Sequence, residues 1–237
     1  MALRFEHRPA DTDARIVDRV WRTTSDAEET MTSVARTCCH LIVTRTAGQL
    51  LVTLRGPETR ATTAPVPPDA EFLGVRLTLG AVLRPHPATS IVDSHVSFPV
   101  TRSGRVVIGG ADWETPTYGN VEQFVRRLRL AGLLVPSHPA GAEVDRHRST
   151  RTLQRYHRAM TGLSQTAVTQ IDRANAAATM LRDGLDWRAV VDTLGYFDQA
   201  HLAHALRRFV GHTARGLGTG NSPAMSFLYK PDPRPGS

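Results

Sequence analysis

Short apolar segments with the alternating pattern of β-strands dominate the first 110 residues of the chain. Thr37–Thr46 and Gln49–Arg55 are rich in β-branched and apolar residues, and Ala47-Gly48 between them has the length of a hairpin turn. Phe72–Leu79 alternates as another strand, and weaker strand patterns occur in Ile91–Val96 and Arg105–Ile108. The proline-rich segment Thr63–Asp69 is expected to lack regular structure. The pattern predicts a β-rich region whose sheet folds on itself as a sandwich or barrel.

Helical spacing of the apolar residues begins at Asn120. In Asn120–Ala131 one face is apolar and the rest carries arginines, and Gly132 is expected to end the helix. Pro136–Gly141 contains two prolines and a glycine, a composition typical of a linker. The sequence therefore predicts an α+β protein. We expect a β-rich domain over residues 1–135, a linker over 136–148, an all-α domain over 149–217 and a tail over 218–237.

Paired start and stop signals predict four helices in the C-terminal region. The predicted helices cover residues 149–160, 165–182, 187–194 and 198–209. Each follows or begins with a residue whose side chain can accept a hydrogen bond from the first turn, and a glycine lies beyond each end. The capping residues are Ser149, Ser164, Asp186 and Asp198. Four consistent starts and stops indicate a compact helical domain.

The last two predicted helices have the spacing of a helix-turn-helix, because only Leu194-Gly195-Tyr196-Phe197 separates them. We expect the final helix to bury an apolar face and to expose small or hydrogen-bonding residues that can contact base edges in a major groove. The buried face is predicted to contain Leu202, Ala205, Leu206 and Phe209. The candidate DNA-contacting residues are Gln199, Ala200, His201, His204 and Arg207.

The helix over 149–160 offers a similar pattern, with an inward stripe predicted at Leu153, Tyr156, His157 and Met160. Its candidate DNA-contacting residues are Arg151, Gln154, Arg155 and Arg158. The helix over 165–182 between the two is ~27 Å long at 1.5 Å per residue. It could hold two base-reading helices near one turn of DNA apart, ~34 Å. The alternative is a four-helix bundle whose arginines only solvate its surface.

Residues Ser149–Arg155 (STRTLQR), Thr161–Ser164 (TGLS) and Gly195–Leu202 (GYFDQAHL) resemble the DNA-binding domain of AraC-type transcriptional regulators. The resemblance spans Ser149 to Leu217. Three further segments are similar to uncharacterised actinobacterial-type members of that family, namely Trp21–Asp26, Arg55–Thr59 and Ser226–Lys230. The resemblance implies two helix-turn-helix units that bind double-stranded DNA. It also implies an N-terminal domain, often cupin-like, that senses a small-molecule effector or forms a homodimer, and contact with RNA polymerase in an activator.

By position, the resemblance assigns base or phosphate contacts to Arg151, Gln154 and Arg155 in the first unit. In the second unit it assigns them to Gln199, Ala200, His201 and His204. The chain departs from the family pattern where His204 replaces an arginine, His157 a buried phenylalanine and Ala214 a proline. No apolar stripe marks a scaffold helix in residues 138–148. These departures leave a second interpretation open, a ligand-binding or interaction protein with a degenerate helix-turn-helix domain.

The charge distribution is compatible with a polyanionic partner. The net charge is +7, and residues 143–217 contain 11 arginines against 7 acidic residues. A solvated basic surface would give the same count. The chain lacks both an apolar run long enough to span a membrane and an export signal at its start, so we expect a cytoplasmic protein with no membrane partner.

The sequence predicts no enzyme, no cofactor and no metal site. The two cysteines, Cys38 and Cys39, are adjacent, and there is no CxxC, HExxH, HxH, GxSxG or glycine-rich phosphate-loop pattern. Alternation along the strand is expected to bury one of the two thiols, which disfavours redox sensing. Four aromatic residues of the β-rich region could line a ligand pocket or belong to its core. They are Trp21, Phe98, Trp113 and Tyr118.

Overall fold

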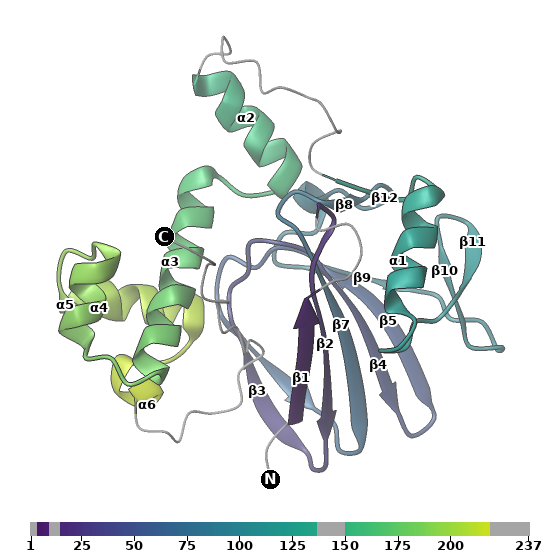
Figure 1. Cartoon of the computed structure of the whole chain (residues 1–237), viewed down its shortest axis with the longest axis horizontal. Coiled ribbons are helices and arrows are strands. Elements are labelled where there is room, and N and C mark those ends of the chain that lie inside the picture. The colour runs from purple at the N-terminus through teal and green to yellow at the C-terminus, as the bar shows by residue number, and fades with distance from the viewer. Residues whose placement is uncertain (1–3, 10–14, 137–149, 219–237) are drawn as a thin grey trace.

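A computed structural model describes residues 4–9, 15–136 and 150–218, and it shows a mixed α+β protein (Figure 1). A β-rich N-terminal region is followed by a group of helices beside it, so the predicted α+β class is confirmed. Residues 137–148 of the predicted linker, the predicted cap Ser149 and residues 219–237 of the tail lie outside the described residues.

Six strands form an antiparallel sheet in the order β1-β2-β7-β4-β5-β9. Their bounds are β1 Arg4–Pro9, β2 Val17–Ser25, β4 His40–Thr46, β5 Gln49–Arg55, β7 Ala70–Leu77 and β9 His95–Phe98. The predicted hairpin is confirmed, because His40 to Thr46 pair with Arg55 to Gln49 around the Ala47-Gly48 turn. Strand β1 stands at one end of this order and β9 at the other.

The period of two along these strands gives the sheet two different faces. One face buries side chains such as Val20, Leu41 and Leu73 in a core that also contains the apolar stripe of α1 (Val121–Leu130). The helix was predicted over Asn120–Ala131, and its stripe of Val121, Phe124, Val125 and Leu128 is buried as expected. The opposite face carries Trp21, Ile42 and Phe72, which line a cavity described below.

Three two-stranded ribbons complete the β-rich region. They are β3 (Glu29–Ser33) with β6 (Thr62–Val66), β8 (Val82–Leu83) with β12 (Leu134–Val135), and β10 (Arg105–Ile108) with β11 (Ala111–Glu114). The short 3₁₀ helix η1 is Ala88–Ser90. The prediction that Thr63–Asp69 lacks regular structure is wrong for the residues in β6. This strand pairs with β3 alone, so the missing N–H of Pro65 is tolerated at its other edge.

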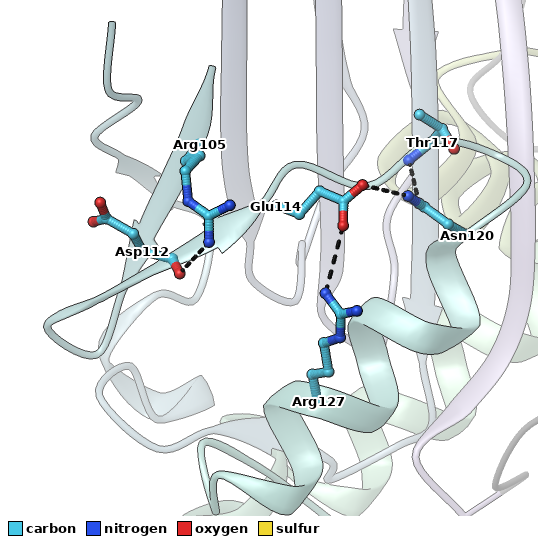
Figure 2. Close-up of polar contacts among 6 residues, drawn as sticks. All are labelled: Arg105, Asp112, Glu114, Thr117, Asn120 and Arg127. Carbon is cyan, nitrogen blue, oxygen red and sulfur yellow. Dashed lines mark hydrogen bonds and ion pairs between the residues drawn. The ribbon is translucent and has the colours of Figure 1, made fainter. Parts of the chain in front are cut away.

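Polar contacts fasten the β10–β11 ribbon to the start of α1 (Figure 2). The Glu114 carboxylate accepts hydrogen bonds from Asn120 Nδ2 at 3.3 Å and from Arg127 Nη1 at 3.4 Å. Asn120 Oδ1 in turn accepts from the Thr117 backbone N–H at 2.7 Å. The Asn120 side chain therefore braces the loop before α1 rather than capping the helix itself.

The C-terminal helices are α2 (Thr150–Thr161), α3 (Gln165–Arg182), α4 (Trp187–Leu194), α5 (Gln199–Ala205) and α6 (Ala214–Gly218). The predicted caps at Ser164, Asp186 and Asp198 are confirmed, since each side chain accepts a backbone N–H of the first turn. The last predicted helix differs from expectation after Ala205. It continues there as a π-helical segment, η2 (Leu206–Val210), and ends at Gly211 in the left-handed conformation.

Candidate nucleic-acid interface

Helix α5 is held by an apolar face that is buried as the sequence predicts. Leu202 and Leu206 are 1% and 0% exposed, and Ala205 and Phe209 are also buried, in a core shared with α3 and α4. Gly195 ends α4 with φ +67°, which turns the chain towards α5 without a steric penalty. Asp198 Oδ1 accepts the His201 backbone N–H at 2.7 Å and so fixes the first turn of α5.

The outer side of α5 and η2 leaves the predicted DNA-contacting residues exposed to solvent. Gln199, Ala200, His204 and Arg207 are all exposed. Ala200, His204 and Arg207 follow helical spacing on one side, and Gln199 lies in the first turn. A small residue followed by hydrogen-bonding side chains lets such a helix approach base edges closely. We call Gln199, Ala200, His204 and Arg207 the α5 stripe.

The structure gives His201 a local partner within the turn. Its Nδ1 accepts a hydrogen bond from the Phe197 backbone N–H at 3.3 Å, and its ring meets Tyr196 edge-on with centroids 5.1 Å apart. Although His201 is exposed, its ring braces the start of α5 instead of standing free beside the α5 stripe. Next to it, Phe197 is 91% exposed, which sequence reasoning missed because a phenylalanine in such a pattern is usually buried.

Helix α2 also exposes its candidate contacts, but its inward stripe is packed less completely than predicted. Arg151, Gln154, Arg155 and Arg158 are exposed. Leu153 and Tyr156, expected to face inward, are each 36% exposed, and His157 and Met160 are half-buried. The prediction of a buried stripe is therefore wrong for Leu153 and Tyr156. The residues that directly precede α2 lie outside the described range.

Specific contacts fix the C-terminal end of α2 against α3 and η1. Thr161 Oγ1 accepts the Leu163 backbone N–H at 3.1 Å, and His157 Nδ1 lies 3.3 Å from the Leu163 carbonyl oxygen. At Gly162, φ is +77°, and an added Cβ would lie 2.7 Å from Val92 Cγ2. The turn between α2 and α3 is thus pressed against the loop that contains η1.

Helix α3 connects the two sets of candidate contacts without bringing them together. Figure 1 shows α2 at one end of α3, whereas α4 and α5 lie along the side of α3. The 18 residues of α3 correspond to ~27 Å. The residues of α2 and those of the α5 stripe therefore form two separate exposed patches rather than one cluster.

The contacts that join the helices to the β-rich region leave the α5 stripe exposed. The Ala35 N–H donates to the Phe209 carbonyl oxygen at 2.7 Å, and the Ala61 N–H donates to that of Arg208 at 2.8 Å. Asn175 Nδ2 donates to the Ala35 carbonyl oxygen at 3.0 Å. Val34 and Ala35 are fully buried among the helices. The β-rich region therefore covers a side of α3 and η2 that does not include the α5 stripe.

Positive charge is in excess on the described helices. Residues 150–218 contain nine arginines and five aspartates. Three of these arginines lie over aromatic rings of the same region, Arg173 over Tyr196, Arg188 over Trp187 and Arg208 over Phe209. Within the described ranges, no acidic side chain pairs with Arg151, Arg155, Arg158 or Arg207. These four guanidinium groups are therefore available to a polyanion.

Burial raises the pKa of Cys38 to about 11 and that of Cys39 to about 12, so neither thiol is a ready nucleophile. In the part of the chain that is described, no group of three or more histidine, cysteine, aspartate or glutamate side chains could hold a metal ion. None of the described helices is long and apolar enough to cross a membrane.

Comparison with known proteins places the chain in no family. No protein-family model, curated protein or solved structure matches it.

Proposed function

We propose that the chain is a sequence-specific DNA-binding transcriptional regulator that contacts two adjacent major-groove segments through α2 and α5. The observation that carries this proposal is the α5 stripe. It is an exposed set of small and hydrogen-bonding residues on a helix whose opposite face is fully buried. In this proposal α4, the Gly195 turn and α5 act as a helix-turn-helix, with α5 as the base-reading helix.

The second contact in this proposal is α2, the other base-reading helix. Its exposed Arg151, Gln154, Arg155 and Arg158 combine side chains that can pair with guanine or adenine edges with side chains that neutralise phosphates. The 18-residue length of α3 is compatible with two contacts about one turn of DNA apart. A single chain could then read both segments, with or without a second copy as partner.

The β-rich region is proposed to modulate DNA binding in response to a small-molecule effector. The segment from Thr32 to Thr37 supports this, because it contacts the helices at several points. His212 Nε2 lies 3.0 Å from Thr32 Oγ1, and Thr37 Oγ1 donates to the Asp172 carboxylate at 3.3 Å. A displacement of this segment would be transmitted directly to α3 and η2. A cupin-like identity for the region, a cytoplasmic location and the absence of enzymatic activity stay predictions.

A second candidate is an interaction protein whose helical domain no longer reads DNA. The partial exposure of Leu153 and Tyr156 on α2 favours it, because an incompletely packed helix would hold its side chains in register less firmly. In that case α2 would dock on another protein through its apolar residues.

The test is to select duplexes from a random pool and measure their binding by fluorescence anisotropy over a range of salt concentrations. We expect log K to fall with log salt by about 0.9 for each phosphate neutralised. Arg207→Ala should weaken binding, whereas Arg126→Ala, which removes an exposed arginine from α1 far from the α5 stripe, should not. Failure to enrich any sequence, or equal losses in the two variants, would favour the second candidate.

A further inference from the structure

A cavity of about 150 Å³ lies between the central sheet and the β3–β6 ribbon. Its walls come from the sheet face opposite α1 and from the inner side of the ribbon. Trp21, Ile42 and Phe72 line it from the sheet, and Met31 and Val66 line it from the ribbon. Space of this size accommodates a molecule with a single six-membered ring. Two of the segments singled out in the sequence, Trp21–Asp26 and Arg55–Thr59, contribute to its walls.

Glycine at position 74 creates room for the indole that forms one wall of the cavity. Trp21 is paired with Gly74 across β2 and β7. A Cβ on Gly74 would lie only 1.9 Å from Trp21 Cε2, so the indole lies directly over the glycine backbone. A flat aromatic surface is therefore built into the sheet face at this point, and Phe72 on the same strand extends it.

The polar part of the wall is positively charged. The lining residues include Arg36 and Arg55, and none of the described residues that line the cavity is acidic. One carboxylate, that of Glu58, lies beside these arginines and pairs with Arg55 Nη2 at 2.9 Å. The Ser33 hydroxyl also donates to Glu58, at 3.2 Å. Arg55 is thus paired with a carboxylate that does not itself line the cavity.

The behaviour of His40 agrees with an excess of positive charge in this part of the molecule. Burial, together with the nearby Arg36, Arg76 and Arg55, holds the pKa of His40 well below its usual range. His40 therefore stays neutral and adds no charge of its own. A negatively charged group entering the cavity would be attracted by the arginines, and the Glu58 carboxylate that pairs with Arg55 is not among the residues that line the cavity.

Two buried hydrogen-bond donors at the wall lack a partner among the described residues. Thr23 is 3% exposed, lines the cavity and has no hydrogen bond to its Oγ1. Arg55 Nε is likewise buried without an acceptor, although its Nη2 is paired with Glu58. Buried polar groups in folded proteins are nearly always hydrogen-bonded, so unsatisfied donors of this kind indicate a missing acceptor.

We infer that this cavity binds a small organic monocarboxylate whose apolar body, about the size of one ring, lies against Trp21 and Phe72 and whose carboxylate accepts hydrogen bonds from Arg55 and Thr23. This inference rests on the proposed function only in that the ligand would be its small-molecule effector. Binding of the monocarboxylate is inferred from the cavity alone and does not depend on DNA binding.

Isothermal titration calorimetry on the full chain, without DNA, tests the site with benzoate as the probe. Benzamide and benzylamine have the same ring and nearly the same size but carry neutral and positive groups. We expect benzoate to bind with a Kd of about a millimolar or tighter. Benzamide should bind at least about tenfold more weakly and benzylamine not at all. No binding of benzoate, or equal binding of benzamide, would overturn the proposal.

Substitutions locate the binding at this cavity. Arg55→Lys keeps the charge opposite Glu58 but removes the guanidinium fork, and it should weaken benzoate binding about tenfold or more. Thr23→Val removes an unpartnered hydroxyl, so it should leave the fold intact and weaken binding about two- to tenfold. Thr24→Val is the matched control, because Thr24 is exposed and adjacent on β2, and it should change nothing.

If Arg55→Lys does not fold, the benzoate affinities of Thr23→Val and Thr24→Val are compared to decide whether benzoate binds in this cavity. Unchanged affinity in folded Thr23→Val protein would mean that benzoate binds elsewhere and would reject the site. A positive result here combined with no DNA binding would leave the site in place and remove only the proposed regulatory function.

Discussion

Helices α2 and α5 have similar sequence patterns but are supported very differently by the rest of the molecule. The apolar face of α5 is buried completely in a core shared with α3 and α4, and its start and turn are fixed by Asp198 and Gly195. In α2, Leu153 and Tyr156 remain 36% exposed. Periodicity thus predicts which face turns inward, but the burial that results depends on which elements are present to cover it.

The difference bears directly on recognition of DNA. A base-reading helix must hold its side chains in a fixed register, and rigid packing on one face provides this. Helix α5 meets the condition within the described residues. Helix α2 is fixed mainly at its C-terminal end. There Thr161 bonds to Leu163, and Gly162 lies close to Val92. We therefore expect α5 to be the more rigid of the two contacts.

Cavity-forming substitutions should give the largest contrast between the two helices. Leu206, at the start of the η2 continuation of α5, is 0% exposed. Leu206→Ala is therefore expected to lower the free energy of unfolding by about 2–5 kcal/mol. Leu153→Ala should lower it by less than about 1 kcal/mol, because the side chain is already partly in water. Urea denaturation followed by circular dichroism gives both values. Equal losses would show that α2 is packed as well as α5 in solution.

Replacing the exposed glutamine of each helix by alanine should give the next largest effect, a loss of DNA-binding free energy. If α5 and α2 each read one groove segment, Gln199→Ala and Gln154→Ala should each cost about 1–3 kcal/mol of binding free energy on the selected duplex. Each should also relax the preference at a different base pair. Competition binding against single-base variants of the duplex measures this. An effect of Gln199→Ala alone would reduce the protein to a single reading helix.

Equal losses on selected and random duplexes would instead identify these glutamines as phosphate contacts. In that case the sequence preference would have to come from other residues of the two helices. The salt dependence measured in parallel separates the cases, because a lost phosphate contact lowers the slope of log K against log salt by about one.

Alanine in place of the turn glycines should give the smallest effect and should differ between the two turns. Gly195 has φ +67° and no atom within 4 Å of an added Cβ, so Gly195→Ala should cost only about 1 kcal/mol for the left-handed backbone. Gly162→Ala should cost more, because its Cβ would also meet Val92 and the Ala88 carbonyl oxygen. Thermal unfolding of the two variants compares them. A larger loss at Gly195 would contradict the close approach of η1 to the α2–α3 turn.

Several parts of the fold could be predicted because local chemistry decides them. The hairpin around Ala47-Gly48, the helix over Val121–Leu130 and the caps at Ser164, Asp186 and Asp198 depend on residues close together in the sequence. The exposed positions of the α5 stripe were predicted for the same reason, since helical spacing alone separates them from the buried face. Cys39 is buried and Cys38 is half-buried, but both precede β4, so the predicted alternation along a strand starting at Thr37 does not explain the difference.

Other features depend on partners distant in the sequence. Strand β6 forms despite Pro65 because β3, some thirty residues earlier, offers it one paired edge. Leu153 and Tyr156 are each 36% exposed, which the helical spacing of α2 could not predict. The π-helical segment after Ala205 and the local role of His201 also appear only once the neighbouring turns are placed. Of the four aromatic candidates, Trp21 lines the cavity, Phe98 belongs to the core, and Trp113 and Tyr118 are partly buried and pack against that core.

The sequence by itself determined the division into a β-rich and a helical region, the limits of most C-terminal helices and the residues that α5 presents to solvent. These follow from periodicity and capping, which act over a few residues. Only the tertiary structure decided which surfaces are covered and which hollows remain. The cavity brings together residues from separate segments, among them Arg36, Arg55, Trp21 and Thr23. The pattern along one strand does not indicate which other segment will pack across it.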